Sequence, residues 1–343
     1  MQPHNSSRVR LWDFVKFLAV FLVIWGHCIK GFFSSDCHDS AMFRYINSFH
    51  MPLFMMISGY FSVSSIAMEK MEFFKKKFMR LVYPCIIWGG ILWIILEVAY
   101  SFHYGNSECS LLGLLTDYYW FSDFWFLKSC FICYVLVYLG VHTKFNQLYW
   151  MTITLLISQA ISPFFVSFMY PCFLIGYVLR LNPPFMESVK SYPYFLSILF
   201  VLMLVFWDKE MWINSHGIPK GIAFFDMQKW VNLIICRLFR LLIGIVGSLA
   251  CISIISRIFG VISETRIVSL CCDWGNYTLN IYILQRLVLE MGISRLININ
   301  NSSSFVINFI IIPFVSLIIL VLCVCITKLI NMSPKLERVL WGI

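Results

Sequence analysis

Long apolar runs alternate with short polar segments along the whole chain. Apolar windows of roughly 20 residues, the length that crosses a hydrocarbon core, recur ten times in the sequence. The pattern predicts an all-α, polytopic transmembrane helix bundle of about ten spans. The fifth and sixth windows adjoin at Ser162-Pro163, so one long broken segment is the alternative there. The windows lie at residues 12–33, 42–62, 80–101, 124–142, 147–163, 164–180, 192–208, 230–254, 270–293 and 304–330.

Composition agrees with this pattern. Of the 343 residues, 60% are hydrophobic and 13% are charged, whereas a soluble domain has about 45–50% apolar and about 25% charged residues. These values exclude a soluble enzyme, a disordered protein and a secreted disulfide scaffold. The spans leave too few residues for a separate soluble domain, so we expect a single membrane domain over residues 1–343. The weak dyad alternation of an outer-membrane barrel is absent from the sequence.

Basic residues in the loops predict the orientation. With the N-terminus inside, fifteen Lys and Arg residues fall on the cytoplasmic side and six on the outer side. This bias follows the positive-inside rule, so we expect both termini in the cytoplasm and the protein in the inner (cytoplasmic) membrane. It also accounts for the net charge of +9, so no nucleic-acid partner is expected. Asp13 and Lys16 interrupt the first apolar run, which argues against a cleaved signal peptide.

The 13 cysteines give few clues to function, because most lie in predicted spans, where Cys acts as a small apolar residue. Cys37 and Cys109 fall in two outer loops and can pair in an oxidising compartment, a possibility that the sequence leaves open. No Cys/His spacing resembles a zinc site, and no metal is expected.

Ionisable residues inside predicted spans are the first candidates for function, because each is costly unless it faces a cavity or a partner. The first span contains Asp13, Lys16 and His27. Lys16 and His27 lie about 20° apart around the helix and about 16 Å apart along its axis, so they share one stripe. Asp13 is one turn before Lys16 and can hold its ammonium. The alternative is a snorkelling lysine and a histidine packed against a neighbouring helix.

A second histidine lies at a similar depth. The second span places His50 near its outer end, close in depth to His27. Imidazole suits general-base chemistry near neutral pH, so His27 and His50 are the catalytic candidates, with Asp13 in support. Pro52 in the same span is expected to cause a kink.

The loop after this span, EKMEFFKKKFMRLVYP, is the most basic segment. Topology explains part of this charge. The cations also lie where a phosphorylated cytosolic ligand would need them.

Several motifs appear in one order along the chain: RLWDFVKFLAVFLVIWGH, FHMPLFMMISGYF, KKKFMRLVYP, WFL at 125–127, PCFLIGYVL and WGNYTLNIYILQ. Together they resemble the membrane-bound acyltransferase 3 family, which O-acetylates bacterial surface glycans. The FHMPLF and WFL variants are similar to its fucose or sugar O-acetyltransferase branch. The resemblance covers nearly the whole chain.

The resemblance assigns roles to particular residues. Lys16 and His27 match the family's basic residue and His separated by ten residues, and Lys77 and Arg80 match its basic-x-x-Arg pattern before the third span. It implies acetyl-CoA as the donor, entering from the cytosol. It also implies an outer hydroxyl of a surface glycan or lipid-linked sugar as the acceptor, with the bilayer as the surroundings.

Two motifs depart from the family pattern. Gln285 and Arg286 end the motif of the ninth span, where many members have His, and Lys128 and Cys130 follow the WFL where another branch carries Glu. Trp125 and Gln285 are kept as substrate-binding candidates, while the roles of these two spans stay open.

The residues and the resemblance point to one mechanism. The basic cluster would hold the phosphates of coenzyme A, and His27 would deprotonate the acceptor hydroxyl that attacks the thioester. A covalent acetyl-histidine is the alternative route. Arg237 and Arg240 are substrate-binding candidates for a CoA phosphate or the developing oxyanion, and an ion pair with Asp273 or Glu97 is their structural alternative.

The competing functional class is a secondary transporter or a membrane sensor without acyl-transfer chemistry. Buried charges and a Pro-interrupted helix suit a transporter. The sequence lacks paired discontinuous helices in two halves and an intramembrane carboxylate relay, which favours the enzyme.

Overall fold

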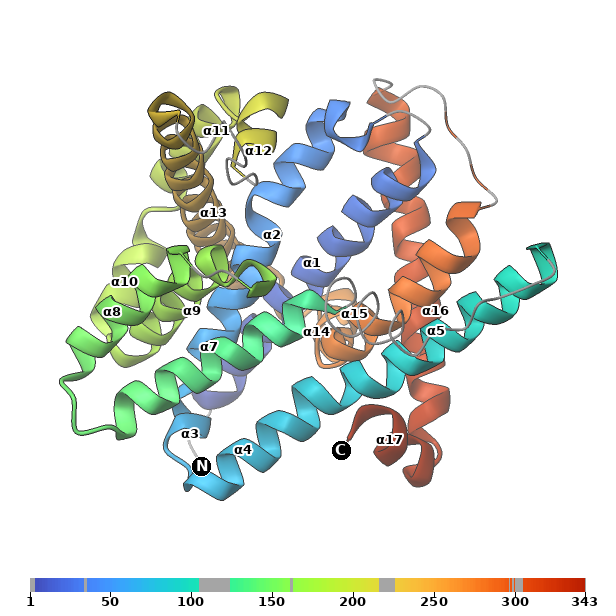
Figure 1. The fold of residues 1–343 in the computed structure, drawn as a ribbon, viewed down its shortest axis with the longest axis horizontal. Coiled ribbons are helices and arrows are strands. Elements are labelled where there is room, and N and C mark those ends of the chain that lie inside the picture. The colour runs from blue at the N-terminus through green and yellow to red at the C-terminus, as the bar shows by residue number, and fades with distance from the viewer. Residues whose placement is uncertain are drawn as a thin grey trace. The chain divides into compact units, whose positions relative to one another are not determined.

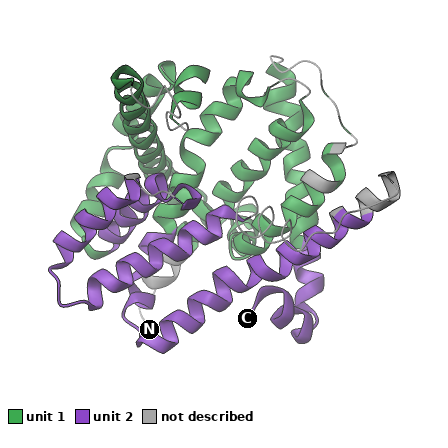
Figure 2. Ribbon diagram, in the orientation of Figure 1, with its two compact units in different colours: residues 1–57, 181–324 green, residues 58–180, 325–343 purple. Residues whose placement is uncertain are grey.

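A computed structural model describes residues 4–33, 36–104, 124–160, 163–215, 226–295, 297, 299 and 305–342. Helices dominate these residues, and the strand-like pairing in them is one isolated bridge between Phe33 and Ile299. The predicted all-α class is therefore confirmed. The chain divides into two compact units (Figure 2): unit 1 contains Met1–Ile57 and Leu181–Val324, and unit 2 contains Ser58–Arg180 and Cys325–Ile343.

Unit 1 contains the first helix and most of the second half of the chain (Figure 1). Its elements are α1 (His4–Phe32), the 3₁₀ turn η1 (Cys37–Asp39), α2 (Ala41–Tyr60, which ends in unit 2), α10 (Pro183–Ser191), α11 (Pro193–Val205), α12 (Lys209–Asn214), α13 (Met227–Ile262), α14 (Arg266–Gly275), α15 (Thr278–Gln285), the π-helix η6 (Arg286–Gly292), the 3₁₀ turn η7 (Ile293–Arg295), the π-helix η8 (Ile307–Ile311) and most of α16 (Ile312–Asn331).

Close backbone approaches fix the packing of α1 in unit 1. A Cβ at Gly275 would collide with the carbonyl group of Asp13, and a Cβ at Gly31 would lie 2.9 Å from Ser294 Cβ. Because both pairs advance along the chain together, α1 and the α14–η7 segment run parallel and side by side. Small residues let helices in a bilayer pack this closely.

The second helix is held by small residues of α13. Pro52 interrupts the hydrogen-bonding ladder of α2, and a Cβ at Gly244 would lie 2.8 Å from Pro52 Cγ and 3.1 Å from Ser48 O. Ser248 Oγ donates to Phe49 O at 3.3 Å. These contacts set the position of α2 in the turn that carries His50.

Unit 2 contains the basic segment and the helices around it. Its main elements are α3 (Val63–Ile66), α4 (Lys70–Lys77), the π-helix η2 (Phe78–Val82), α5 (Tyr83–Tyr104), α7 (Trp125–His142), α8 (Gln147–Ala160), the 3₁₀ turn η4 (Pro163–Phe165), α9 (Val166–Leu181) and α17 (Pro334–Trp341). Phe73 of α4 stacks on Tyr138 of α7 with ring centroids 4.0 Å apart. A Cβ at Gly59 would collide with the carbonyl of Phe173 in α9. Within unit 2, α7 contacts α3, η2, α8 and η4.

Six helices in the described residues are long and apolar enough to cross a membrane, and a pair bent by 72°, α10 and α11, is a possible seventh. These segments coincide with the first, third, fourth, sixth, seventh, eighth and tenth predicted windows. The remaining windows fall on α2, α8 and the α14–η6 segment, which are helical but too polar, too short or interrupted to pass the same test. The count of ten and the cytoplasmic termini remain predictions.

Candidate active site

Two histidines from neighbouring helices lie close together in unit 1. His27 on α1 and His50 on α2 are near enough for their imidazoles to interact electrostatically. The helices meet at Gly26, where an added Cβ would lie 3.5 Å from Ile46 Cγ2. Since Gly26 adjoins His27 and Ile46 is one turn before His50, this contact places the two histidines within about a turn and a half of each other along the helix axes.

The backbone of α2 fixes the tautomer of His50. The side chain is buried, and its Nδ1 lies 2.7 Å from the carbonyl oxygen of Ile46. A carbonyl oxygen can only accept, so Nδ1 carries the proton and the neutral ring has its lone pair on Nε2. His27 is half-buried. The arrangement supplies one imidazole with a defined proton-accepting nitrogen beside a second, partly accessible one.

Lys16 is paired within its own helix, as the sequence suggested. Its Nζ lies 2.8 Å from Asp13 Oδ1, and Asp13 is buried against Gly275 of α14. Asp13 and His27 are fourteen residues apart on α1, or about 21 Å along the axis. Asp13 therefore orients and neutralises Lys16 and does not lie beside the histidines.

Gln285 is buried on α15, which packs against α1. Its Nε2 donates to the carbonyl oxygen of Tyr282 at 3.4 Å, and its Oε1 has no hydrogen-bond partner among the described residues. Buried amide oxygens are usually paired, so this one is available to a donor group. The chain continues from Gln285 directly into the π-helix η6, and π-helical turns occur frequently at functional sites.

Arg237 and Arg240 of α13 converge on one residue beyond α12. Arg237 Nε donates to Ser215 O at 3.4 Å, and Arg240 Nη1 donates to Ser215 Oγ at 3.2 Å. The Arg240 guanidinium also lies over the Trp212 ring, 4.5 Å from its centroid. These contacts anchor α12 to α13, and they are a structural role that the sequence did not suggest for this pair.

In unit 2, the basic segment contains a buried lysine. Lys77 is 7% exposed, and its Nζ lies 3.6 Å from the centroid of the Tyr134 ring. Tyr134 is held in turn by its hydroxyl, which donates to Ser58 O at 3.1 Å. Within the part of the chain that the structure describes, Lys77 forms no ion pair. A buried ammonium without a carboxylate partner is uncommon, because burial of a lone charge is costly.

Arg80 follows on the π-helix η2, three residues after Lys77, and its side chain is exposed. The two cations lie within one helical turn of each other, and the π form of η2 determines the angle between them. The segment therefore contains one buried ammonium and one exposed guanidinium within one helical turn.

Trp125 lies at the start of α7, nine residues before Tyr134 and about 13 Å away along the axis. Its ring packs edge to face with Phe165, at a centroid distance of 5.0 Å. The nearby Lys128 lies over the Phe164 ring. Trp125 thus belongs to an aromatic cluster and is not beside Lys77.

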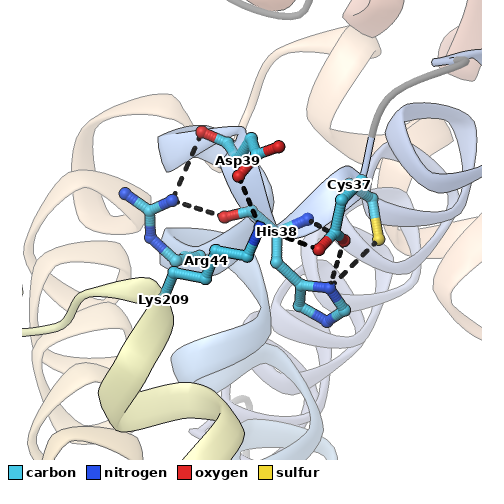
Figure 3. Close-up of polar contacts among 6 residues, drawn as sticks. Cys37, His38, Asp39, Arg44 and Lys209 are labelled. Carbon is cyan, nitrogen blue, oxygen red and sulfur yellow. Dashed lines mark hydrogen bonds and ion pairs between the residues drawn. The ribbon is translucent and has the colours of Figure 1, made fainter.

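Figure 3 shows a polar cluster between η1 and α12, with Arg44 and Lys209 directed at the η1 loop. Lys209 Nζ binds Asp36 at 2.9 Å and Asp39 at 2.7 Å, and Arg44 Nη1 donates to the carbonyl of His38. The His38 N–H and the Lys209 ammonium hold the pKa of Asp36 well below its ordinary value, and the two carboxylates raise the pKa of Lys209.

The same loop gathers three potential metal-ligand atoms, from Asp36, Cys37 and His38, within 4.8 Å of one another, which the sequence spacing did not predict. The ammonium of Lys209 already pairs with the carboxylates of Asp36 and Asp39. Burial raises the pKa of the Cys37 thiol. The suggested pairing of Cys37 with Cys109 cannot be followed, since Cys109 lies outside the described residues.

Three residues that position these groups were not identified from the sequence. The Tyr134 ring contacts the Lys77 ammonium, and Gly275 packs against the carbonyl group of Asp13. Ser215 accepts hydrogen bonds from Arg237 and Arg240. The glycine of WGNY belongs to a noted motif, so Gly275 had a sequence signal. Nothing in the local pattern marks Tyr134 or Ser215.

Comparison with known proteins gives one family match. The family model described as "Acyltransferase domain" matches residues 10–328. The chain is 28% identical over 229 residues to the nodulation protein NolL of Mesorhizobium japonicum, covering 62% of this chain and 60% of that protein. It is 27% identical over 184 residues to NolL of Sinorhizobium fredii, covering 50% of this chain and 49% of that protein. The chain thus spans about half to three fifths of these relatives, and no solved structure matches it.

Proposed function

Because the chain belongs to the acyltransferase 3 family, we propose that it is a multi-pass O-acetyltransferase of the inner membrane. It would move an acetyl group from cytosolic acetyl-CoA to a hydroxyl of a cell-surface glycan or its lipid-linked precursor. Family membership, carried by a match over residues 10–328, makes the chain a membrane acyltransferase and favours transfer chemistry over the transporter alternative. The acetyl-CoA donor, the glycan acceptor and the location in the inner membrane are proposals.

The observation that supports this chemistry most is the imidazole pair. His50 has its proton on Nδ1, bound to the Ile46 carbonyl, so Nε2 can accept a proton. In the proposed reaction, one imidazole of the pair takes the proton of the acceptor hydroxyl. The oxygen then attacks the thioester carbonyl, and the thiolate of CoA leaves and is protonated. The second imidazole would hold the acceptor or relay that proton.

A covalent route through an acetyl-histidine uses the same residues. The Nε2 lone pair would attack the thioester, CoA would leave, and the acceptor oxygen would then take the acetyl group. Single-turnover trapping with radiolabelled acetyl-CoA in the absence of acceptor separates the two routes, because label stays on the protein only in the covalent one.

Donor binding is proposed for the basic pair of unit 2. Acetyl-CoA carries phosphates, and Lys77 has no carboxylate partner among the described residues. Arg80 is exposed and presents a planar fork suited to a phosphate. These two residues would bind the nucleotide end of the donor.

The other candidates keep narrower proposed roles. Lys16, oriented by Asp13, would line the path of acetyl-CoA along α1. The Oε1 of Gln285 would accept a hydrogen bond from acetyl-CoA or from the glycan. Trp125 would contribute an aromatic surface to substrate. For Arg237 and Arg240, a contact with substrate phosphate or oxyanion would add to their bonds with Ser215.

The test is acetyl transfer by the purified protein in detergent or nanodiscs. Radiolabelled acetyl-CoA and candidate glycans are supplied, and free CoA thiol and labelled glycan are both measured. His27→Ala and His50→Ala should each lower turnover by roughly 10²–10⁴-fold. His142, which stacks on Tyr138 in α7, provides the matched control, and His142→Ala should keep full activity. Movement of intact substrate without thiol release would contradict the proposal.

A further inference from the structure

The last helix, α17, is anchored by a single buried residue. Leu336 and Val339 on this helix are 49% and 52% exposed, whereas Trp341 is fully buried. The Trp341 ring stacks on Trp88 of α5, with centroids 5.2 Å apart and ring planes at 27°. Trp88 Nε1 donates to the carbonyl oxygen of Leu340 at 3.0 Å. Two tryptophans therefore lock α17 onto α5.

Gly342, the residue that follows Trp341, packs against the basic segment. Gly342 has φ +68°, a left-handed conformation that favours glycine, and its N–H donates to Arg338 O at 3.1 Å. A Cβ on Gly342 would collide with the carbonyl of Met79 and lie 3.0 Å from Tyr83 Cδ1. Gly342 is therefore seated on the backbone of η2, directly before Arg80.

A π-helical turn depends on its surroundings. It is rare, with wider i→i+5 hydrogen bonds, and usually occurs as a single turn inside an α-helix. Its conversion to α-helix changes the register by one residue, which rotates the side chains before it relative to those after it by about 100°. Arg80 lies inside this turn and Lys77 lies directly before it. Because Arg80 lies within the turn, part of this rotation would apply to it, and the direction of Arg80 relative to Lys77 therefore depends on the π form of η2.

We propose that the Trp88–Trp341 stack and Gly342 hold η2 in its π form and so set the direction of Arg80 relative to Lys77. Trp341 and Gly342 are positioning residues for the phosphates of the acyl donor and do not touch it. This inference rests on the proposed donor site. It extends that site because α17 would influence the affinity for the acyl donor through the position of Arg80.

The test measures equilibrium binding of CoA itself, which does not require acetyl transfer, together with the KM values for acetyl-CoA and for acceptor. Trp341→Ala should weaken CoA binding and raise the donor KM by about fivefold or more, because small displacements of binding groups have large effects. The acceptor KM and kcat should stay within twofold. Trp341→Phe, which retains an aromatic stack, should recover most of the affinity, and Gly342→Ala should resemble Trp341→Ala. Leu336→Ala, an exposed position on the same helix, is the matched control and should bind CoA like the parent.

A double variant separates positioning from a general loss of structure. If Trp341 acts through Arg80, Trp341→Ala combined with Arg80→Ala should bind CoA no more weakly than Arg80→Ala alone. Multiplied effects, or an unchanged CoA affinity in monodisperse Trp341→Ala protein, would overturn the inference. If the parent protein binds no CoA, both the inference and the proposed donor site at Lys77 and Arg80 are wrong. A parent that binds CoA with the expected response to these variants, yet transfers no acetyl group, would uphold the inference and reject the proposed reaction.

Discussion

Replacing Lys77 with methionine should weaken binding of the acyl donor while leaving the protein at least as stable as the parent. Lys77 is 7% exposed, lies 3.6 Å from the Tyr134 ring centroid and has no ion pair among the described residues. Methionine keeps an unbranched chain of similar length, so packing against Tyr134 is largely preserved. The substitution removes the charge and little else.

The magnitudes favour opposite effects on stability and affinity. The cation–π contact contributes roughly 0.5–2 kcal/mol, whereas desolvation of an ammonium costs several kcal/mol. Removing the charge should therefore be neutral or stabilising. In the complex, a charge-assisted bond to a phosphate contributes about 1.5–3 kcal/mol, which corresponds to about a tenfold to hundredfold rise in the donor KM.

Both quantities can be measured on one preparation. Thiol release gives the donor KM, and thermal unfolding in detergent gives the stability. Lys76→Met removes an exposed cation from the same helix and should change neither value by much. A Lys77→Met protein that melts at lower temperature with an unchanged donor KM would refute the reasoning and make Lys77 a structural residue.

The remaining predictions concern the histidines, the arginine and the topology. His27→Ala should reduce acetyl transfer by roughly 10²–10⁴-fold while the protein still accumulates in the membrane, and retention of more than about a tenth of the activity would make His27 a packing residue. Arg80→Ala should raise the KM for acetyl-CoA by about tenfold to a hundredfold, with the acceptor KM unchanged; Arg80→Lys should recover only part of this, because it keeps the charge but loses the bidentate fork. Equal donor KM values in Arg80→Ala and the parent would leave Arg80 with a role in topology alone. A reporter fused after Ile343 should be active only in the cytoplasm, and activity confined to the periplasm would contradict the predicted orientation.

The helical class and the main spans could be predicted from the sequence because apolar length is a local property. The predicted spans on α2, α8 and the α14–η6 segment contain several polar residues and are not among the described helices long and apolar enough to cross a membrane. Arg44, Asn47 and His50 lower the hydropathy of α2, and α14 and α15 are separated at Asn276. Such segments depend on neighbouring helices for their stability, and those neighbours cannot be read from the segments themselves.

The candidate site could be predicted in part from the sequence, because some of its features depend only on local helical spacing. Helical periodicity placed Lys16 near Asp13, and the two side chains form an ion pair. The similar depth of His27 and His50 stays a prediction. The tautomer of His50 and the burial of Lys77 arise from contacts between turns or helices, which periodicity does not specify. The π-helical form of FMRLV likewise has no pattern of its own in the sequence.

The central claim is that this membrane acyltransferase uses an imidazole of the His27–His50 pair to move an acetyl group from acetyl-CoA to a glycan hydroxyl. The most direct measurement follows radiolabel from acetyl-CoA to a purified glycan acceptor, with parent, His50→Ala and His142→Ala proteins matched for amount and folding. The account predicts labelled glycan and one equivalent of free thiol with the parent and with His142→Ala, and a loss of both by roughly 10²-fold or more with His50→Ala. Equal labelling by the parent and His50→Ala, or thiol release without labelled glycan, would contradict it.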